Sequence, residues 1–371
     1  MNIKPEVVSR LRLHLTNILG TGASQLVSSL LPAIERCSNF KVEQVFLPDQ
    51  GHLSTYRFMS NETTNTVYRR WLPNSVSRFL ECTVLGHKFD GKSPLFVLGD
   101  IPLPCRGPQT VFVQTPHIIR PIENLKPTFE LKYMILRGVF KLNQNRARSF
   151  IVQTDVMRQE LERSYPKVNG KVHVIPQPVP NWLLKSGLVR REREASASRK
   201  LCLIYPAAGY KHKNHALLSR ITPDIEWNID SLILTLESAS NPAPKIPWVR
   251  CVGFLAPEEM INLYSKADAL LFLSKKESYG FPLIEAMFIG LPIICPDLPY
   301  ARTLCKDQAI YFDPDEPGSL HQAVAKLRKN FDEGWWPNWQ NCLTNIPADW
   351  DAVARRVLTV VCGEELDVVE S

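Results

Sequence analysis

The chain has 371 residues, which suggests two domains, and its 44% hydrophobic and 22% charged residues exclude wholesale disorder. The net charge of +7 suits an anionic ligand or surface without identifying it. Nine scattered cysteines without a C-x-x-C spacing, no signal-peptide pattern and no run of about 18 apolar residues predict a reduced, cytoplasmic protein that does not span a membrane.

Short apolar runs alternate with helical patterns through the first half of the chain. A helix is predicted at residues 23–36, after a Gly-Thr-Gly turn. Strands are predicted at residues 11–16, 41–47, 95–98, 110–114, 150–153 and 172–175. Strands that alternate with helices form parallel βαβ units, so residues 1–188 are expected to form a doubly wound, Rossmann-like domain.

Residues 189–200 (VRREREASASRK) mix charges with small polar residues and predict a linker, with a surface loop inside one domain as the alternative. A second alternating series follows, with helices at 257–266 and 281–289. Its predicted strands are residues 201–205, 231–236, 249–254, 269–273, 292–295 and 309–312.

The second series predicts another Rossmann-like domain over residues 201–345. Residues 346–371 are expected to form a C-terminal helix that returns to the first domain, followed by an acidic tail. The fold class is therefore predicted as α/β, with two doubly wound domains facing a central cleft, where ligands bind at the carboxyl ends of the strands.

The segment after the fourth strand of the second series, residues 274–292 (SKKESYGFPLIEAMFIGLP), carries the strongest chemical pattern. Gly280 precedes a helix predicted to start at Phe281 or Pro282, because proline is favoured in a first helical turn. The free N–H groups and the helix dipole at such a start attract anions. The sequence therefore predicts a phosphate site at Gly280, Phe281 and Pro282.

Two glutamates flank that helix start. Glu277 is on the predicted loop, and Glu285 is eight residues later, in the first turns of the helix. Both carboxylates could face the cleft and accept hydrogen bonds from sugar hydroxyls.

The order strand, S-x-x-E, S-Y-G-F-P-L-I-E-A-M, G-L-P-I resembles the signature of glycosyltransferase family 4, E-G-F-G-L-P-x-L-E-A-M-A-x-G-x-P. This chain departs from it at Ser278, Tyr279 and Phe281. Residues 252–268 (VGFLAPEEMINLYSKAD) and 309–314 (AIYFDP) are similar to further segments of the same family.

The resemblance assigns roles to residues outside the signature. Residues 205–215 (YPAAGYKHKNH) look like the turn where a family lysine binds the donor diphosphate, which maps to Lys213. Many members carry an arginine five residues earlier, where this chain has Ala208. His117, in VFVQTPHII, resembles a family histidine that faces the reacting sugar carbon. Gly20, Thr21 and Gly22 look like the glycine-rich loop near the donor phosphate.

What the family implies is a GT-B fold and transfer of a sugar, with retention, from a nucleotide-diphospho-sugar to a glycan or lipid-diphosphate-linked acceptor, in polysaccharide or glycoconjugate synthesis. Lys213 would stabilise the diphosphate, Glu277 would orient sugar hydroxyls, and Glu285 would hold the ribose. Phe254 would line the base pocket. No cofactor or metal is expected.

Two other functions use the same pattern. An epimerase or phosphorylase of this fold would carry further carboxylates and histidines in the cleft, and only His117 is a candidate. A non-catalytic nucleotide-sugar-binding partner subunit is the second alternative, because Ala208 lacks a charge. Nucleic-acid binding is not expected, because aromatic residues do not interleave with a basic stripe.

A basic helix in the first half predicts peripheral attachment to an anionic membrane. In residues 126–148, Arg137, Lys141 and Arg148 fall within about 40° of one another at 100° per residue, so they should form an outward stripe. Most apolar residues of the segment would pack on the sheet. Residues 68–80 add Arg69, Arg70, Trp71 and Arg78. A solvated helix face is the alternative interpretation.

Overall fold

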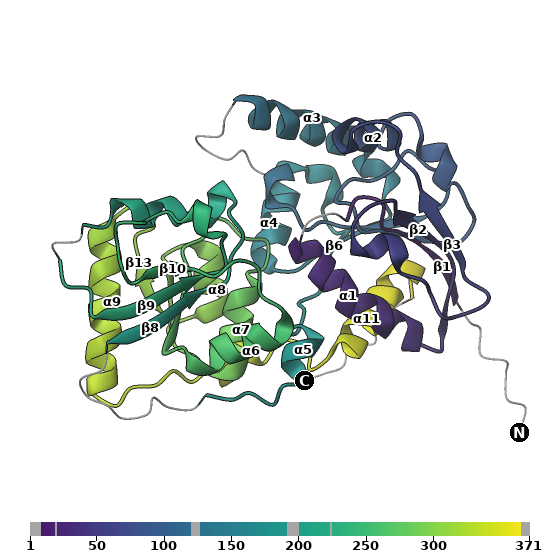
Figure 1. Ribbon diagram of the computed structural model, residues 1–371. Helices are drawn as coiled ribbons and strands as arrows, with labels where there is room; N and C mark the ends of the chain where they lie inside the picture. The colour runs from purple at the N-terminus through teal and green to yellow at the C-terminus, as the bar shows by residue number, and fades with distance from the viewer. Residues whose placement is uncertain (1–8, 19–20, 120–126, 191–199, 223–224, 365–371) are drawn as a thin grey trace, which may run out of the picture. The chain divides into compact units, whose positions relative to one another are not determined.

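The computed structural model describes residues 9–18, 21–119, 127–190, 200–222 and 225–364. The chain divides into two compact units. The first contains residues 1–178 and 347–371, and the second contains residues 179–346. Each unit is built around one parallel sheet with its own helices (Figure 1).

The first sheet has seven strands in the order β3-β2-β1-β4-β5-β6-β7, and every neighbouring pair is parallel. The strands are β1 (Ser9–His14), β2 (Phe40–Pro48), β3 (Thr64–Tyr68), β4 (Leu95–Val97), β5 (Gln109–Phe112), β6 (Ser149–Val152) and β7 (Val172–Val174). The strand order reverses between β1 and β4, which is where such sheets bind ligands beyond their carboxyl ends.

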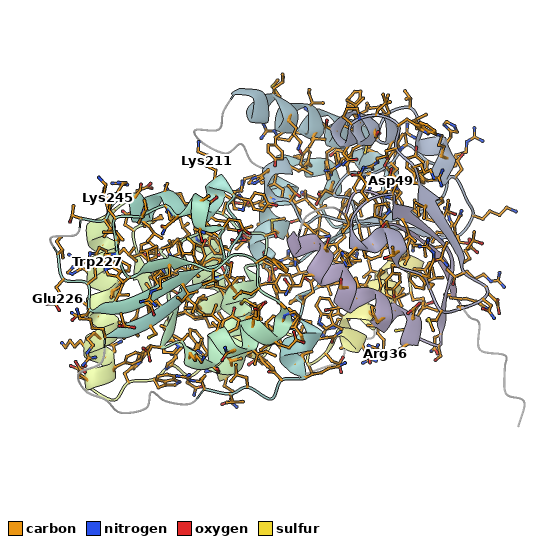
Figure 2. The ribbon with its side chains drawn as sticks, in the orientation of Figure 1. Arg36, Asp49, Lys211, Glu226, Trp227 and Lys245 are labelled. Carbon is orange, nitrogen blue, oxygen red and sulfur yellow. The ribbon has the colours of Figure 1, made fainter. Side chains whose placement is uncertain are left out.

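The helices of the first unit come from both ends of the chain. They are α1 (Thr21–Arg36), α2 (Asn74–Glu81), α3 (Pro127–Asn143), α4 (Asp155–Ser164) and α11 (Trp350–Cys362). α11 lies along α1, and Arg36 is at the end of α1 (Figure 2). The Arg36 guanidinium donates to Asp351 of α11 over 2.5 Å. The C-terminal helix is therefore part of the first unit.

The second sheet has six parallel strands in the order β10-β9-β8-β11-β12-β13. The strands are β8 (Leu201–Tyr205), β9 (Ile229–Leu234), β10 (Val249–Cys251), β11 (Ala269–Leu271), β12 (Ile293–Pro296) and β13 (Ile310–Phe312). The helices are α5 (Asn181–Leu184), α6 (Pro257–Lys266), α7 (Phe281–Ile289), α8 (Pro299–Cys305), α9 (Pro317–Asp332) and α10 (Gln340–Leu343). The order reverses between β8 and β11.

The second unit begins earlier than the sequence predicts. Val179 and Leu183 are buried in its hydrophobic core, so residues 179–188 belong to this unit and not to the first domain. The backbone N–H of Arg190 donates to the carbonyl of Ile289 over 2.5 Å, which fixes the start of the expected linker against α7. Residues 191–199 of that linker lie outside the described residues.

Two further features bear on compartment and membrane. All nine cysteines are free thiols. In the described part of the chain, no helix combines the length and apolar character needed to cross a bilayer.

Candidate functional site

Two loops meet at the carboxyl edge of the second sheet, where its strand order reverses. The loop after β8 ends in a 3-10 turn, η6 (Lys211–Lys213), and the loop after β11 runs from Phe272 to Gly280. The carbonyl of His212 accepts from the Ser274 Oγ over 3.2 Å and from the Lys275 N–H over 2.8 Å. The two loops are therefore fixed to each other by hydrogen bonds.

Lys213 and Glu277 form an ion pair across these loops. The Lys213 Nζ lies 2.5 Å from the Glu277 Oε1, and the two side chains are 15% and 10% exposed. The Tyr205 hydroxyl donates to the Lys213 carbonyl over 2.8 Å, and the Lys213 Nζ lies 5.9 Å from the centre of the Phe272 ring. The structure thus brings together the residues expected to contact the diphosphate and the transferred sugar.

Two neutral histidines and a further lysine lie near this pair. Burial lowers the pKa of His212 to about 4, and the charges of Lys213 and Lys276 lower it further. Burial and then Lys213 also lower the pKa of His215 to about 4. Both imidazoles are neutral at pH 7, so the lysines supply the charge at this edge. Lys276 is a basic residue that the sequence analysis missed, although it directly precedes Glu277.

The start of α7 depends on the backbone of Gly280. Gly280 has φ 86°, a left-handed conformation that residues with a Cβ rarely adopt. A Cβ there would come 3.2 Å from the Leu283 Cδ1, and the Gly280 carbonyl accepts from the Leu283 N–H over 2.9 Å. Phe281 and Pro282 form the first turn, as the sequence predicts. The dipole of α7 therefore begins next to the loop that holds Glu277.

Glu285 lies deeper than the sequence analysis expects. It is 4% exposed, and its Oε2 accepts a 2.6 Å hydrogen bond from the hydroxyl of Tyr264 on α6. Burial, followed by the Glu285 charge, raises the pKa of Tyr264 well above its usual value. A buried carboxylate needs such a donor. One of its oxygens is thus engaged inside the unit rather than presented to a cleft.

Phe254 does not sit in a preformed pocket. It follows Gly253 in the loop after β10, and its side chain is 82% exposed. Gly253 has φ 78°, and a Cβ there would approach the Glu237 Oε1 to 3.5 Å. The expected base-lining role would therefore need a ligand to cover an exposed ring. Glu237, after β9, is a second polar group at this edge that the sequence analysis missed.

His117 belongs to the first unit. It lies in the 3-10 turn η3 (Pro116–Ile118) after β5, and its buried ring meets the ring of Tyr133 on α3 at 4.9 Å between centroids. Asp100, with φ 65°, accepts from the N–H groups of Gln114 over 2.7 Å and of Thr115 over 2.9 Å. This carboxylate positions the segment that leads to His117.

The expected glycine-rich loop is described only in part. Thr21 and Gly22 form the first turn of α1 instead of a free loop, and Gly20 lies outside the described residues.

A buried polar cluster at the end of β1 was not expected from the sequence. The Arg70 side chain is 4% exposed, and its NH2 lies 2.7 Å from Glu81 Oε1. Thr16 donates to the other Glu81 oxygen over 2.9 Å and lies 3.1 Å from the His14 Nε2. Burial, with the Arg70 charge, lowers the pKa of His14 to about 3. Arg70 is therefore bound inside the first unit and cannot be part of an outward basic surface.

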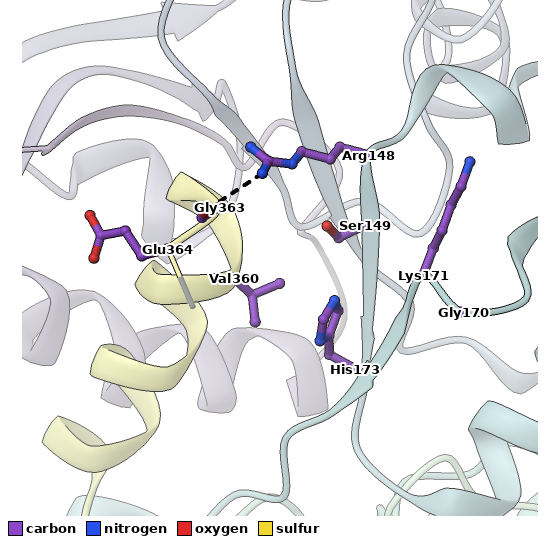
Figure 3. Close-up of a pocket in the computed structure, with 8 residues that line it drawn as sticks. All are labelled: Arg148, Ser149, Gly170, Lys171, His173, Val360, Gly363 and Glu364. Atoms are coloured by element: carbon purple, nitrogen blue, oxygen red, sulfur yellow. Dashed lines mark hydrogen bonds between the residues drawn. The ribbon is translucent and has the colours of Figure 1, made fainter. Parts of the chain in front are cut away.

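A pocket of about 340 Å³ lies elsewhere on the first unit (Figure 3). It is next to the amino ends of β6 and β7, and Arg148 on its wall donates to the Gly363 carbonyl over 3.5 Å. Its lining residues are Arg148, Ser149, Gly170, Lys171, His173, Val360, Gly363 and Glu364. None of the expected site residues lines this pocket.

Comparisons with known proteins bear on the second unit above all. The family model described as glycosyl transferases group 1 matches residues 245–333, which include Glu277, Gly280 and Glu285. The serotype-specific mannosyltransferase WbdA of Escherichia coli is 30% identical over 115 residues, which cover 31% of this chain and 14% of WbdA. The O-antigen chain mannosyltransferase RfbU of Salmonella typhimurium is 23% identical over 242 residues, 61% of this chain and 63% of RfbU. This chain therefore matches less than two thirds of either relative's length.

Solved structures match both units. Sucrose-phosphate synthase from Thermosynechococcus elongatus has a TM-score of 0.65 at 14% identity, over 95% of this chain and 98% of that one. HepE of Anabaena, solved with UDP and glucose, has a TM-score of 0.56 at 13% identity, over 95% and 99%. These matches establish the fold, and they confirm the predicted α/β class with two parallel Rossmann-like sheets.

Proposed function

Because this chain belongs to the glycosyl transferases group 1 family and has a GT-B fold, we propose that it transfers a sugar from a nucleotide-diphospho-sugar to a glycan or lipid-diphosphate-linked acceptor. The observation that carries the proposal is the Lys213–Glu277 ion pair at the reversal point of the second sheet. A cation and a carboxylate at that edge suit a ligand that joins an anionic diphosphate to a hydroxyl-rich sugar.

The chemistry follows from charge. As the bond from the anomeric carbon to the diphosphate breaks, the sugar becomes cationic and negative charge grows on the leaving oxygen. Lys213 and the N-terminal end of α7 supply fixed positive charge for that oxygen, and such preorganised groups need no rearrangement at the moment of reaction. Retention at the anomeric carbon is part of the proposal.

Glu277 has two successive partners in this account. Without donor it accepts from Lys213, as the 2.5 Å distance indicates. With donor bound, the diphosphate competes for the three ammonium hydrogens of Lys213, and Glu277 turns to accept from sugar hydroxyls and to offset positive charge on the ring.

Lys276 is proposed to provide the charge that Ala208 lacks. It lies near enough to η6 for its charge to lower the pKa of His212. We assign the second cation of the diphosphate site to Lys276 because hydrogen bonds from Ser274 and Lys275 to the His212 carbonyl hold its loop against η6.

The transferred sugar is proposed to be mannose, and the product a polysaccharide or glycoconjugate. WbdA and RfbU are mannosyltransferases by name, and RfbU acts on the O-antigen chain. HepE supports a nucleoside diphosphate leaving group, because its structure holds UDP. We propose a metal-independent reaction, in which Lys213 and the N-terminal end of α7 supply the positive charge at the diphosphate.

The test is a thermal-shift screen of the full chain against UDP-, GDP-, ADP- and dTDP-sugars, followed by analysis of the products formed from any donor that binds. A ligand that binds only the native state raises the unfolding temperature. The proposal expects one nucleotide class to stabilise the protein and its sugar to be released or transferred. An isomerised donor would indicate an epimerase, and binding without turnover would indicate a non-catalytic subunit.

A further inference from the structure

Eight large apolar side chains are exposed on α2, α3 and the residues just before α2. We call this set the α2–α3 apolar surface. Trp71 is 91% exposed and Leu142 is 71% exposed. The complete set is Trp71, Leu72, Val76, Phe79, Leu131, Met134, Ile135 and Leu142. The two helices are joined at their ends, because the Asn143 Nδ2 donates to the Cys82 carbonyl over 2.6 Å, and they lie together at the top of the first unit in Figure 1.

The helix α3 has two apolar faces instead of one. At about 100° per residue, Leu131, Met134, Ile135 and Leu142 fall within about 100° of one another around the helix. The core of the first unit is contacted by a different set, Leu136, Val139 and Phe140. A surface helix of a globular protein normally turns a polar face to water. The exposed apolar face of α3 therefore indicates an interaction site, as exposed apolar patches generally do.

The basic stripe of Arg137, Lys141 and Arg148 predicted from the sequence is not present in the structure. α3 ends at Asn143, so Arg148 is not on the helix and instead lines the pocket beside Gly363. Arg137 is half-buried, and only Lys141 of the expected stripe is exposed on the helix. Apolar side chains, and not a row of cations, dominate the outward face.

The charges around the α2–α3 apolar surface are mainly basic. Residues 69–81 and 127–142 contain six basic residues and two acidic ones, Glu130 and Glu81, and Glu81 is buried against Arg70. Arg70 and Arg78 are engaged with Glu81 and Asp100. The exposed cations are Arg69, Lys132 and Lys141.

We propose that the α2–α3 apolar surface docks the protein on an anionic phospholipid bilayer. Trp71 and the aliphatic side chains would enter the interface between headgroups and acyl chains, while Arg69, Lys132 and Lys141 would lie at the level of the anionic headgroups. Lysine is depleted in protein–protein interfaces, whereas Lys and Arg beside Trp and Leu characterise helices that lie on membranes. The inference rests on surface composition alone and is independent of the proposed sugar transfer.

The experiment is co-sedimentation of the full chain with vesicles of phosphatidylcholine, alone or mixed with phosphatidylglycerol, at low and high salt. We expect binding to the mixed vesicles, weakened by salt. Replacing Lys132 and Lys141 by Gln should reduce partitioning about thirtyfold, because each cation near an anionic leaflet contributes about a factor of five. The variant W71S/L142S should reduce it by about tenfold or more.

Matched controls change exposed residues of the second unit. Val189→Ser removes an exposed apolar side chain. Lys245→Gln removes an exposed cation (Figure 2). Neither change should alter partitioning. Equal partitioning of W71S/L142S and the parent protein would overturn the proposal. So would a change of oligomeric state in that variant by sedimentation equilibrium without vesicles, which would identify the surface as an interface between copies of the chain.

Discussion

Lys213 and Glu277 are separated by 64 positions in the chain and by 2.5 Å in the fold. The residue types and the loop that holds Glu277 could be predicted from the sequence, because the S-x-x-E pattern follows a recognisable buried strand. Their pairing could not, because it depends on which strands are neighbours in the sheet. The burial of Glu285 was equally unforeseeable, since its partner Tyr264 comes from a different helix.

Replacing Lys213 by Ala should reduce kcat/KM for the nucleotide sugar by about 100-fold or more, because a preorganised positive charge on the leaving group is lost. Release of the nucleoside diphosphate measures this directly. Lys211→Ala, on the same turn but outside the ion pair, provides the comparison. Turnover of Lys213→Ala within twofold of the parent would show that Lys213 is only a surface partner of Glu277.

His215 should make the second unit sensitive to acid. Its pKa of about 4 lies below the usual 6.5, so the unfolded chain binds more protons between those values and stability falls as the pH drops through that window. From pH 7 to pH 5 the loss is about 2 kcal/mol. His215→Phe keeps ring packing on Tyr205 and should lose less stability over that range. Denaturant unfolding at both pH values measures this, and identical losses in the two proteins would contradict it.

At the scale of elements, α7 is the structure on which the site depends. Its start at Phe281, after Gly280, could be predicted from the G-F-P order. The C-terminal limit of α3 could not, since the basic pattern continues through Arg148 while the backbone turns at Asn143 to begin a 3-10 turn. The edge strand β3 was also missed, because T-N-T-V-Y is half-exposed and lacks a clear alternation.

Gly280→Ala should destabilise the protein by about 1–2 kcal/mol and weaken donor binding. The left-handed φ of 86° disfavours a Cβ, which would also crowd the Leu283 Cδ1. Gly318→Ala is the matched control, because it lies in the first turn of α9 with nothing within 4 Å of the added atom. Calorimetric titration and thermal unfolding of both variants are needed. An unchanged Gly280→Ala protein would mean that the α7 start tolerates a different backbone.

Variants of Glu285 and its partner Tyr264 can distinguish a structural role of Glu285 from a role in donor binding. Glu285→Ala leaves the buried Tyr264 hydroxyl without its acceptor and should cost about 1–3 kcal/mol of stability. Glu285→Gln keeps an acceptor oxygen, and Tyr264→Phe removes the hydroxyl alone. If Glu285 also holds the ribose, Glu285→Gln should weaken donor affinity while Tyr264→Phe should not, by calorimetry. Equal affinities in all three proteins would leave Glu285 with the structural role only.

For the whole molecule, alternation of strands and helices was enough to predict two doubly wound units, since parallel strands require crossover helices. The boundary at Val179 was not predictable, because residues 179–188 look like loop and helix end until Leu183 is seen in the second core. The α2–α3 apolar surface could not be predicted from the sequence either. A sequence pattern marks α3 as apolar and basic, but only the packing shows which apolar residues remain exposed.

The central claim is sugar transfer from a donor held at the Lys213–Glu277 pair, and nucleoside diphosphate release tests it most directly. The full chain and its Glu277→Gln variant would be incubated with the best-binding nucleotide sugar, with a mannosylated glycan or with water as acceptor. We predict release with the sugar transferred by the parent protein, and a kcat at least about 100-fold lower with nearly unchanged donor affinity in Glu277→Gln. Tight donor binding with no release by the parent protein, or equal kcat in the two proteins, would contradict the account.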